Sequence, residues 1–226
     1  NWIAVSEFAA RALRVCIPAN APIRVIHNGI NFNAFPEPKV TTTGHVGVRV
    51  LNAGSLEARK NQGLILDVAE CFRDSQVVFL LAGDGPDRDK LALEISRRGL
   101  DRHIQLLGYR SDLPSLMRSC DIYLHVAIRE NCPFVILEAI GAGLPVMSVD
   151  SGGIGELIAS TSDEALVHGD RVLPVIEERL SVWVRQPEVR ADIARRQYEY
   201  ASLRFTLAHI FSKTRAYYQD ILHESV

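Results

Sequence analysis

The sequence has few cysteines, no long apolar run and almost no excess of charge. Its four cysteines form no Cys-x-x-Cys or other paired spacing, so a reduced, cytoplasmic protein fits better than a disulfide framework. No apolar stretch approaches the ~20 residues of a membrane span, which leaves at most a peripheral association with a membrane surface. The net charge of −2 provides no basic surface, and we therefore expect no nucleic-acid partner.

The fingerprints of several cofactor sites are also missing. The seven histidines show no metal-ligand spacing and no His-Glu-x-x-His motif, so we expect no metal site. Neither a Walker motif nor Gly-x-Gly-x-x-Gly occurs, which argues against a nicotinamide cofactor. The sequence predicts no bound cofactor.

What the sequence does contain is a regular alternation of apolar runs and amphipathic segments. Strands are expected at 46–53, 77–82, 104–107, 122–126 and 146–149, and helices at 61–73, 86–98, 113–119 and from Pro133 and Ile154. Near-continuous apolar strands that alternate with helices are typical of a parallel sheet covered on both faces. The predicted fold class is therefore α/β, with a Rossmann-like parallel sheet.

The two ends of the chain do not follow this alternation. Residues 1–36 contain a short strand, a helix at 7–15 and a second strand at 24–26, which is too little to close a core. Residues 32–45 have the composition of a linker, rich in proline and threonine. From Leu173 the pattern is helical to the end, with Pro187 between two helices.

The stretch from Arg129 to Gly143 organises the prediction. Pro133 suits the first position of a helix, because its fixed φ is helical and its missing N–H would be unpaired there. The helix would begin beside Glu130 and carry Glu138 on its flank, which leaves free amides between two carboxylates. Such amides favour a phosphate, and carboxylates accept sugar hydroxyls. A nucleotide-sugar has this layout; the alternative is a capped core helix whose acidic residues face water.

Glu130 and Glu138, with the following Ala-Ile-Gly-Ala-Gly-Leu-Pro-Val, resemble the Glu-x7-Glu signature of retaining glycosyltransferase family 4. This family belongs to the group 1 glycosyl transferases of GT-B fold. The resemblance implies that Glu130 lies at the transferred sugar and that Glu138 binds the ribose hydroxyls. The run around Asn28-Gly29 resembles the family's Asn-Gly-Ile/Val-Asp segment, with Asn31 in place of Asp. We interpret Asn28 as part of a turn rather than as a ligand contact.

Other loops resemble the family's donor-binding loops. The loop at Gly54 resembles Gly-Arg-Leu-x-x-x-Lys, with Lys60 in register but Ser55 in place of the arginine, and it stays open whether Arg59 replaces that arginine. The Gly83 turn resembles the family's Gly-x-Gly-Pro, and Tyr109 or Arg110 corresponds to the loop beside the nucleobase. The implied donor-binding residues are Gly54, Ser55, Arg59, Lys60, Gly83, Tyr109, Arg110, Asn131, Cys132, Pro133, Phe134, Val135 and Glu138, with Glu130 and Lys60 as the catalytic residues.

Residues 151–156 and residues 125–127 lie outside the donor-binding loops, and none of them is among the implied donor-binding residues. Residues 151–156 resemble the family's Gly-Gly-x-x-Glu segment, and we expect their backbone amides to face the same crevice, with Glu156 capping its helix. Ala127 stands where the family commonly has serine. His125 is expected to be a satisfied histidine at a strand end rather than a catalyst.

The resemblance also implies a division of the chain. Residues 1–36 would be a remnant of an N-terminal acceptor domain, residues 37–200 the nucleotide-sugar-binding domain, and residues 201–226 a helix that crosses back to the N-terminal domain. Transfer of a sugar from a UDP- or GDP-sugar to an acceptor hydroxyl would follow, as in polysaccharide biosynthesis. The acceptor, a sugar or lipid-linked glycan, would bind through the missing domain. The alternatives are a non-catalytic nucleotide-sugar-binding module and an unrelated phosphate-binding Rossmann domain.

Overall fold

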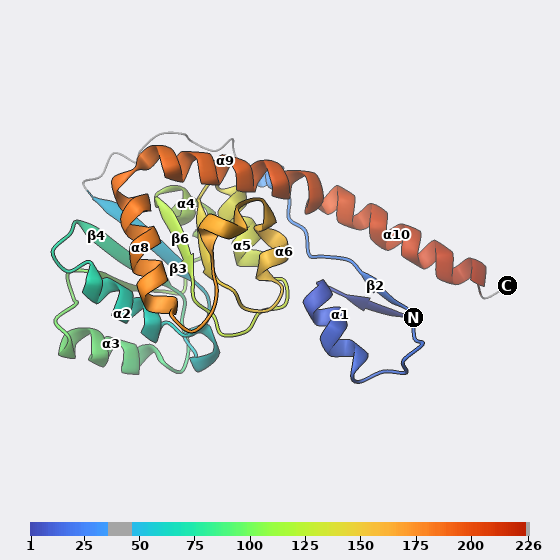
Figure 1. The fold of residues 1–226 in the computed structure, drawn as a ribbon, viewed down its shortest axis with the longest axis horizontal. Coiled ribbons are helices and arrows are strands. Elements are labelled where there is room, and N and C mark those ends of the chain that lie inside the picture. The colour runs from blue at the N-terminus through green and yellow to red at the C-terminus, as the bar shows by residue number, and fades with distance from the viewer. Residues whose placement is uncertain (36–46, 225–226) are drawn as a thin grey trace.

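A parallel sheet of six strands forms the centre of the protein in a computed structural model that describes residues 1–35 and 47–224 (Figure 1). The strand order is β5-β4-β3-β6-β7-β8, and each neighbouring pair runs parallel. The bounds are β3 Val48–Ala53, β4 Val77–Ala82, β5 Ile104–Gly108, β6 Ile122–His125, β7 Val146–Val149 and β8 Leu166–Val167. All four residues of the central strand β6 are buried, as expected for a strand covered on both faces.

Helices cover both faces of this sheet (Figure 1). They are α2 Gly63–Cys71, α3 Arg88–Arg97, α4 Leu113–Arg118, α5 Phe134–Gly141, α6 Ile154–Leu157, α7 Ser162–Ala165, α8 Val172–Arg185 and α9 Pro187–Arg204, with 3-10 turns η1 Phe32–Ala34, η2 Ala58–Lys60 and η3 Ala159–Thr161. The predicted α/β class with a Rossmann-like sheet is therefore confirmed. In the described ranges, no helix combines the length and the apolar character that crossing a bilayer requires.

The first thirty residues form a small unit of their own. Strands β1 (Trp2–Ala4) and β2 (Ile23–Val25) pair in parallel, and the helix α1 (Glu7–Arg14) connects them. Figure 1 shows this unit beside the last helix, α10 (Leu207–Glu224), where the Tyr217 hydroxyl donates to the Trp2 carbonyl at 3.2 Å. The ends of the chain that the alternation did not explain thus lie together.

Helices α2 and α3 each begin two residues later than predicted, and the structure differs from the predicted elements at other places as well. Pro133 has an extended ψ of 124° and precedes α5, so the helix begins at Phe134 rather than at the proline. The two-residue strand β8 was not predicted, because so short a run carries no pattern. The last helical run is broken between α9 and α10, because the Ile30 amide donates to Phe205 O at 2.9 Å and Ile30 O accepts from the Leu207 amide at 3.0 Å. The predicted boundary at residues 36 and 37, with most of the predicted linker, lies outside the described residues.

Candidate functional site

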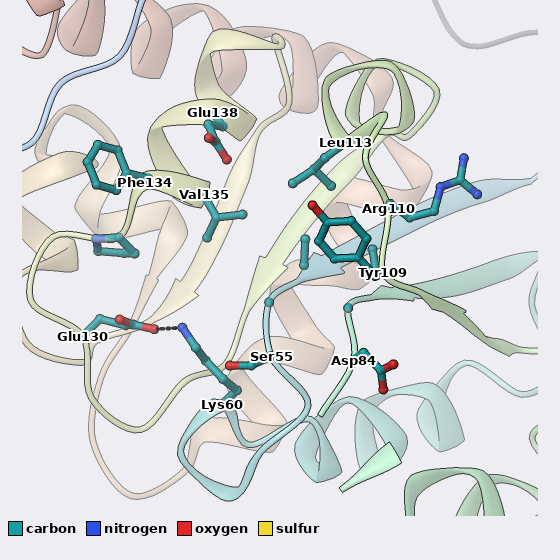
Figure 2. Close-up of a pocket in the computed structure, with 15 residues that line it drawn as sticks. Ser55, Lys60, Asp84, Tyr109, Arg110, Leu113, Glu130, Phe134, Val135 and Glu138 are labelled. Carbon is teal, nitrogen blue, oxygen red and sulfur yellow. Dashed lines mark hydrogen bonds and ion pairs between the residues drawn. The ribbon is translucent and has the colours of Figure 1, made fainter. Parts of the chain in front are cut away.

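A pocket of about 530 Å³ opens where β3, β4 and β5 end and α5 begins (Figure 2). Ligands of parallel α/β sheets bind at this edge, outside the carboxyl ends of the strands. The residues that line it are Ala53, Gly54, Ser55, Lys60, Ala82, Gly83, Asp84, Tyr109, Arg110, Leu113, Glu130, Pro133, Phe134, Val135 and Glu138. Most of the residues predicted from the sequence therefore meet in one cavity.

Close backbone crossings form the floor of the pocket. The Gly54 amide donates to Ala82 O at 2.9 Å, and the Gly83 amide donates to Gly108 O at 2.8 Å. A Cβ at Gly83 would lie 1.8 Å from Gly54 O, far inside contact distance, so only glycine allows the two loops to cross here. The glycines of these motifs thus serve the packing of the loops against one another and leave the floor open to a ligand.

The first turn of α5 presents amides to the pocket. Ile136 is the first residue of the helix whose N–H reaches a carbonyl, that of Pro133 at 3.3 Å, and no side chain of the described chain caps the helix. The amides of Phe134 and Val135 precede it and have no partner within the helix. Together with the dipole of the helix they make this end attractive to an anion.

Glu130 and Lys60 form an ion pair at one end of the pocket (Figure 2). The Nε2 atom of His125 lies 3.6 Å from Glu130 Oε1, beyond hydrogen-bond distance. Burial opposes ionisation of the carboxyl, but the adjacent His125 and Lys60 outweigh burial and lower the pKa of Glu130 to about 2. Glu130 is therefore a carboxylate at neutral pH and cannot serve as a proton donor there.

His125 does not have the satisfied environment that the sequence predicted. Its side chain is 2% exposed, and neither ring nitrogen has a hydrogen-bond partner in the part of the chain that the structure describes. Burial lowers the pKa of His125, which favours the neutral imidazole. The ring stacks on Tyr123, whose hydroxyl donates to Ala53 O at 3.0 Å.

Glu138 approaches the pocket from the flank of α5. Figure 2 shows its carboxylate directed into the cavity, between Glu130 at one end and Tyr109 at the other. Partial burial raises the pKa of Glu138 above its ordinary value, in contrast to Glu130. The two carboxylates thus differ in their environments: one is neutralised by a cation, while the other has no cation paired with it among the described residues.

The opposite end of the pocket carries a ring and a guanidinium. Tyr109 is 81% exposed. Arg110 binds the Asp112 carboxylate through two hydrogen bonds of 2.7 and 2.6 Å and extends away from Lys60 (Figure 2). Because its charge is already compensated, Arg110 offers a planar surface rather than a free cation. Phe134 stands at the rim, half exposed.

Three of the predicted residues do not line the pocket. Arg59 donates to the carbonyl of Arg129 at 3.2 Å and to Glu57 at 2.9 Å, and its guanidinium also lies 3.5 Å from Glu130 Oε1, so it adds positive charge beside that carboxylate. Ser55 lines the pocket, but its hydroxyl donates to the same Glu57 carboxylate at 2.9 Å. Cys132 is buried, burial raises the pKa of its thiol to about 11, and the Asn131 side chain is exposed. Arg59 is not among the residues that line the pocket.

The backbone amides of residues 151–156 were predicted to face the crevice, but none of these residues lines the pocket, and they support the loop that carries Glu130. The Gly153 amide donates to Glu130 O at 3.0 Å. A Cβ at Gly152 would lie 1.8 Å from Glu130 O, and a Cβ at Gly153 would lie 1.9 Å from Asn131 O. Both glycines are thus required by close approach of two backbones.

Glu156 caps a helix, but not its own. It accepts hydrogen bonds from the Glu7 amide at 2.9 Å and the Phe8 amide at 3.1 Å, at the N-terminus of α1. The His27 ring lies 2.7 Å from the same carboxylate. Burial opposes ionisation, and the α1 amides together with His27 lower the pKa of Glu156.

Sequence reasoning missed four residues that line the pocket, Ala53, Ala82, Asp84 and Leu113, and one beside it, Asn28. Asp84 lies in the Gly-Asp-Gly-Pro turn, where its position between the two glycines could have marked it as a lining residue. Leu113 begins a helix after β5, and no pattern distinguishes it from a core leucine. Asn28, interpreted as a turn residue, donates its side-chain amide to Cys132 O at 2.7 Å. Among the described residues, no three His, Cys, Asp or Glu side chains gather in a way that could hold a metal ion.

Sequence comparison links the chain to a large enzyme family. The family model described as glycosyl transferases group 1 matches residues 42–200. N-acetyl-alpha-D-glucosaminyl L-malate synthase of Bacillus anthracis is 21% identical over 168 residues, 74% of this chain and 44% of that protein. The UDP-Gal:alpha-D-GlcNAc-diphosphoundecaprenol alpha-1,3-galactosyltransferase of Escherichia coli is 26% identical over 160 residues, 64% of this chain and 41% of that protein. The chain therefore spans less than half of either relative.

Solved structures share the fold over nearly the whole chain. HepE of Anabaena, crystallised in complex with UDP, superposes with a TM-score of 0.82 at 25% identity, over 96% of this chain and 63% of that one. WaaG, a glycosyltransferase involved in lipopolysaccharide biosynthesis, superposes with a TM-score of 0.77 at 19% identity, over 93% of this chain and 60% of that one. These likenesses agree with the predicted fold class.

Proposed function

Because the chain belongs to the group 1 glycosyl transferases and has the fold of GT-B enzymes, we propose that it is the donor-binding part of a retaining glycosyltransferase. The observation that carries the proposal is the pair of carboxylates, Glu130 and Glu138, on either side of the free amides at the start of α5. A nucleoside-diphosphate sugar offers hydroxyls on both sides of a diphosphate and matches this order.

The donor extends along the pocket from Glu130 to Tyr109. The transferred sugar lies at Glu130, the diphosphate lies over the Phe134 and Val135 amides, and the ribose hydroxyls bind Glu138. The base lies against Tyr109. Uridine is the base that the likeness to HepE supports, since HepE was crystallised with UDP and with UDP-glucose.

Catalysis rests on stabilising the leaving group. As the glycosidic bond opens, negative charge grows on the nucleoside diphosphate, and the amides of α5 with Lys60 supply fixed positive potential at that place. Glu130 holds sugar hydroxyls and stabilises positive charge at the anomeric carbon. Because the pKa of Glu130 is about 2, it acts as a carboxylate throughout. On the same face the departing phosphate takes the acceptor's proton, so the configuration is retained.

The acceptor side of the reaction lies in the part of the enzyme that this chain does not span. We infer that residues 1–36 and the segment 201–226 belong with an acceptor-binding domain, which would bring a sugar or a lipid-linked glycan to the cleft. The likeness to a galactosyltransferase acting on a diphosphoundecaprenol-linked sugar supports a lipid-linked glycan as the acceptor.

A second candidate is a nucleotide-sugar-binding module without catalysis. Ser55 supports it, because the hydroxyl is turned to Glu57 and supplies no charge where the family's arginine would hold phosphate. This module would bind the donor with the same two carboxylates. Only transfer activity distinguishes it from the enzyme.

Calorimetric titration of this chain with UDP, GDP and their glucose conjugates tests the proposal. We expect UDP to bind the wild type and Glu138→Ala to weaken that binding by about tenfold or more, because the ribose loses a charged acceptor. Asp84→Ala, which removes a lining carboxylate outside the α5 bracket, is the matched control and should keep the affinity. No binding of any nucleoside diphosphate by the wild type would refute the proposal.

Sugar transfer by the longer protein separates the two candidates. Glu130→Gln in that protein should abolish transfer of glucose from its UDP conjugate while UDP binding is kept, because UDP carries no sugar for Glu130 to hold. A wild-type protein that binds UDP-glucose and transfers nothing to any glycan acceptor would favour the binding module.

A further inference from the structure

Resting on the proposed function, we propose that Asn28 is a positioning residue for the donor diphosphate. It acts from the N-terminal unit, 104 residues earlier in the chain than its partner, and it touches no part of the pocket. Its side-chain amide donates to Cys132 O at 2.7 Å, a strong hydrogen bond by length. Cys132 immediately precedes Pro133 and the first turn of α5.

The peptide between Cys132 and Pro133, which Asn28 holds, has a single group that can form a hydrogen bond. The nitrogen of Pro133 carries no hydrogen, so the Cys132 carbonyl is the only group of that peptide that can form a hydrogen bond. The orientation of this peptide sets the direction of the next two amides, those of Phe134 and Val135, to which the diphosphate binds. No side chain of the described residues caps α5, so Asn28 supplies the fixed point that a cap would otherwise give.

The backbone of Asn28 is itself clamped on both sides. Before it, His27 lies 2.7 Å from Glu156, which also accepts the first amides of α1. After it, a Cβ at Gly29 would lie 2.9 Å from Phe205 O, and Ile30 forms hydrogen bonds in the break between α9 and α10. The segment from His27 to Ile30 thus joins the N-terminal unit, α6, the last helices and the loop before α5. We call it the joint segment.

The joint segment explains why a residue of the N-terminal unit governs the donor. If that unit shifts, Asn28 moves with it, and the Cys132 peptide turns. The Phe134 and Val135 amides then no longer point toward the same place, as binding of a diphosphate requires. The contact between Asn28 and the Cys132 carbonyl can be turned from attraction into repulsion by one mutation, because replacing the side-chain nitrogen by an oxygen replaces a hydrogen-bond donor by an acceptor.

Asn28→Asp is the sharpest test, because it is nearly isosteric and places a carboxylate oxygen against the Cys132 carbonyl. We expect UDP affinity to fall at least about tenfold, because the side-chain N–H that donates to the Cys132 carbonyl is lost and two oxygen acceptors then face each other. Binding of uridine, which has no phosphate, should change less than about twofold. Asn28→Ala, which adds no charge, should weaken UDP in the same phosphate-dependent way.

Asn31→Asp is the matched control. It makes the same chemical change three residues later, but among the described residues the Asn31 side chain acts through its oxygen alone, which accepts from the Asn33 amide at 3.1 Å, and aspartate keeps that acceptor. Its UDP affinity should equal that of the wild type. Thermal unfolding gives the temperature at which each variant begins to unfold. The titrations are done well below the lowest of these temperatures, where all variants are folded.

The outcomes separate the inference from the proposed function. Equal UDP affinity of wild type, Asn28→Asp and Asn28→Ala would overturn the positioning role and leave the donor site intact. An equal loss of UDP and uridine would also overturn it, because it would indicate general damage. A wild type that binds no nucleoside diphosphate would instead refute the proposed function.

Discussion

Alanine substitutions of Gly152 and Gly153, which face the loop that carries Glu130, allow the effect of a steric clash to be separated from the effect of an unfavourable backbone φ. Gly152 has φ +77°, and a Cβ there would lie 1.8 Å from Glu130 O. A Cβ at Gly153 would lie 1.9 Å from Asn131 O, with no positive φ. Contacts below 3.0 Å essentially never occur for real Cβ atoms, so in each variant two backbones must part by more than about 1 Å.

Such a shift acts on the site directly. Misplacement of a binding group by about 1 Å costs on the order of 10²-fold in function. We therefore expect Gly153→Ala to weaken binding of UDP-glucose by about 10²-fold, because it displaces the backbone beside Glu130. Gly152→Ala should do the same and also lower the free energy of unfolding by about 1–2 kcal/mol for its left-handed φ.

Two other glycines supply the controls. Gly99 has φ +65°, and its nearest atom to an added Cβ is the tip of Arg73 at 3.7 Å, so Gly99→Ala carries the strain without the clash. Gly63 has nothing within 4 Å of an added Cβ and stands at the start of α2, so Gly63→Ala carries neither. Calorimetry with UDP-glucose and chemical denaturation measure both effects. Wild-type affinity in both Gly152→Ala and Gly153→Ala would refute the reasoning.

The remaining predictions concern the charged groups and the extent of the chain. Glu138→Gln should raise the melting temperature at pH 7 while it weakens UDP binding. The raised pKa of Glu138 means that folding disfavours its ionised form, so the contribution of Glu138 to the free energy of unfolding falls as pH rises through that pKa. For the same reason UDP affinity of the wild type should fall as pH is lowered through the raised pKa of Glu138, and this dependence should vanish in Glu138→Gln. Glu130 has a lowered pKa, so its contribution to the free energy of unfolding is present above pH 4.5 and lost as pH falls toward 2; denaturation of Glu130→Gln across this range should lack that loss. His125→Phe should weaken UDP-glucose more than UDP in parallel titrations, because the ring lies beside Glu130 and far from the base. The 226 residues alone should show no sugar transfer in a radiolabel assay, because transfer requires a second domain.

Local patterns in the sequence predicted the elements that local forces determine. Strand β4 was predicted with its observed bounds, because six consecutive apolar residues fit only a strand buried on both faces. The spacing of Glu130 and Glu138 predicted their place at the two sides of the α5 N-terminus, since Glu130 precedes the helix and Glu138 lies on it. The start of α5 was wrong by one residue, because proline's φ suits both a helix and the extended residue before it.

Long-range contacts account for what the sequence could not predict. The orientation of Arg59 depends on the carbonyl of Arg129, seventy residues later, and on competition from Glu57. The Gly152-Gly153 pair was expected to face a ligand, but its glycines are required by a backbone crossing that no local pattern encodes. Asn28 has a turn-like neighbourhood in sequence, and its amide partner is known only once the chain is folded.

The charges of the pocket argue for selection of the whole donor over a bare diphosphate. Of its lining residues, Asp84, Glu130 and Glu138 are acidic while Lys60 and Arg110 are basic, and Arg110 is already neutralised by Asp112. An anion that offers only phosphate oxygens meets a surplus of carboxylates, which repel it. A sugar nucleotide brings hydroxyls that donate to Glu130 and Glu138, so these two carboxylates become acceptors, whereas Asp84 lies outside the α5 bracket and already accepts from the Gly85 amide at 2.8 Å. Inorganic pyrophosphate should therefore compete poorly with UDP-glucose, even though both would occupy the amides of α5. Competition by pyrophosphate as strong as competition by UDP would mean that the carboxylates take no part in recognition.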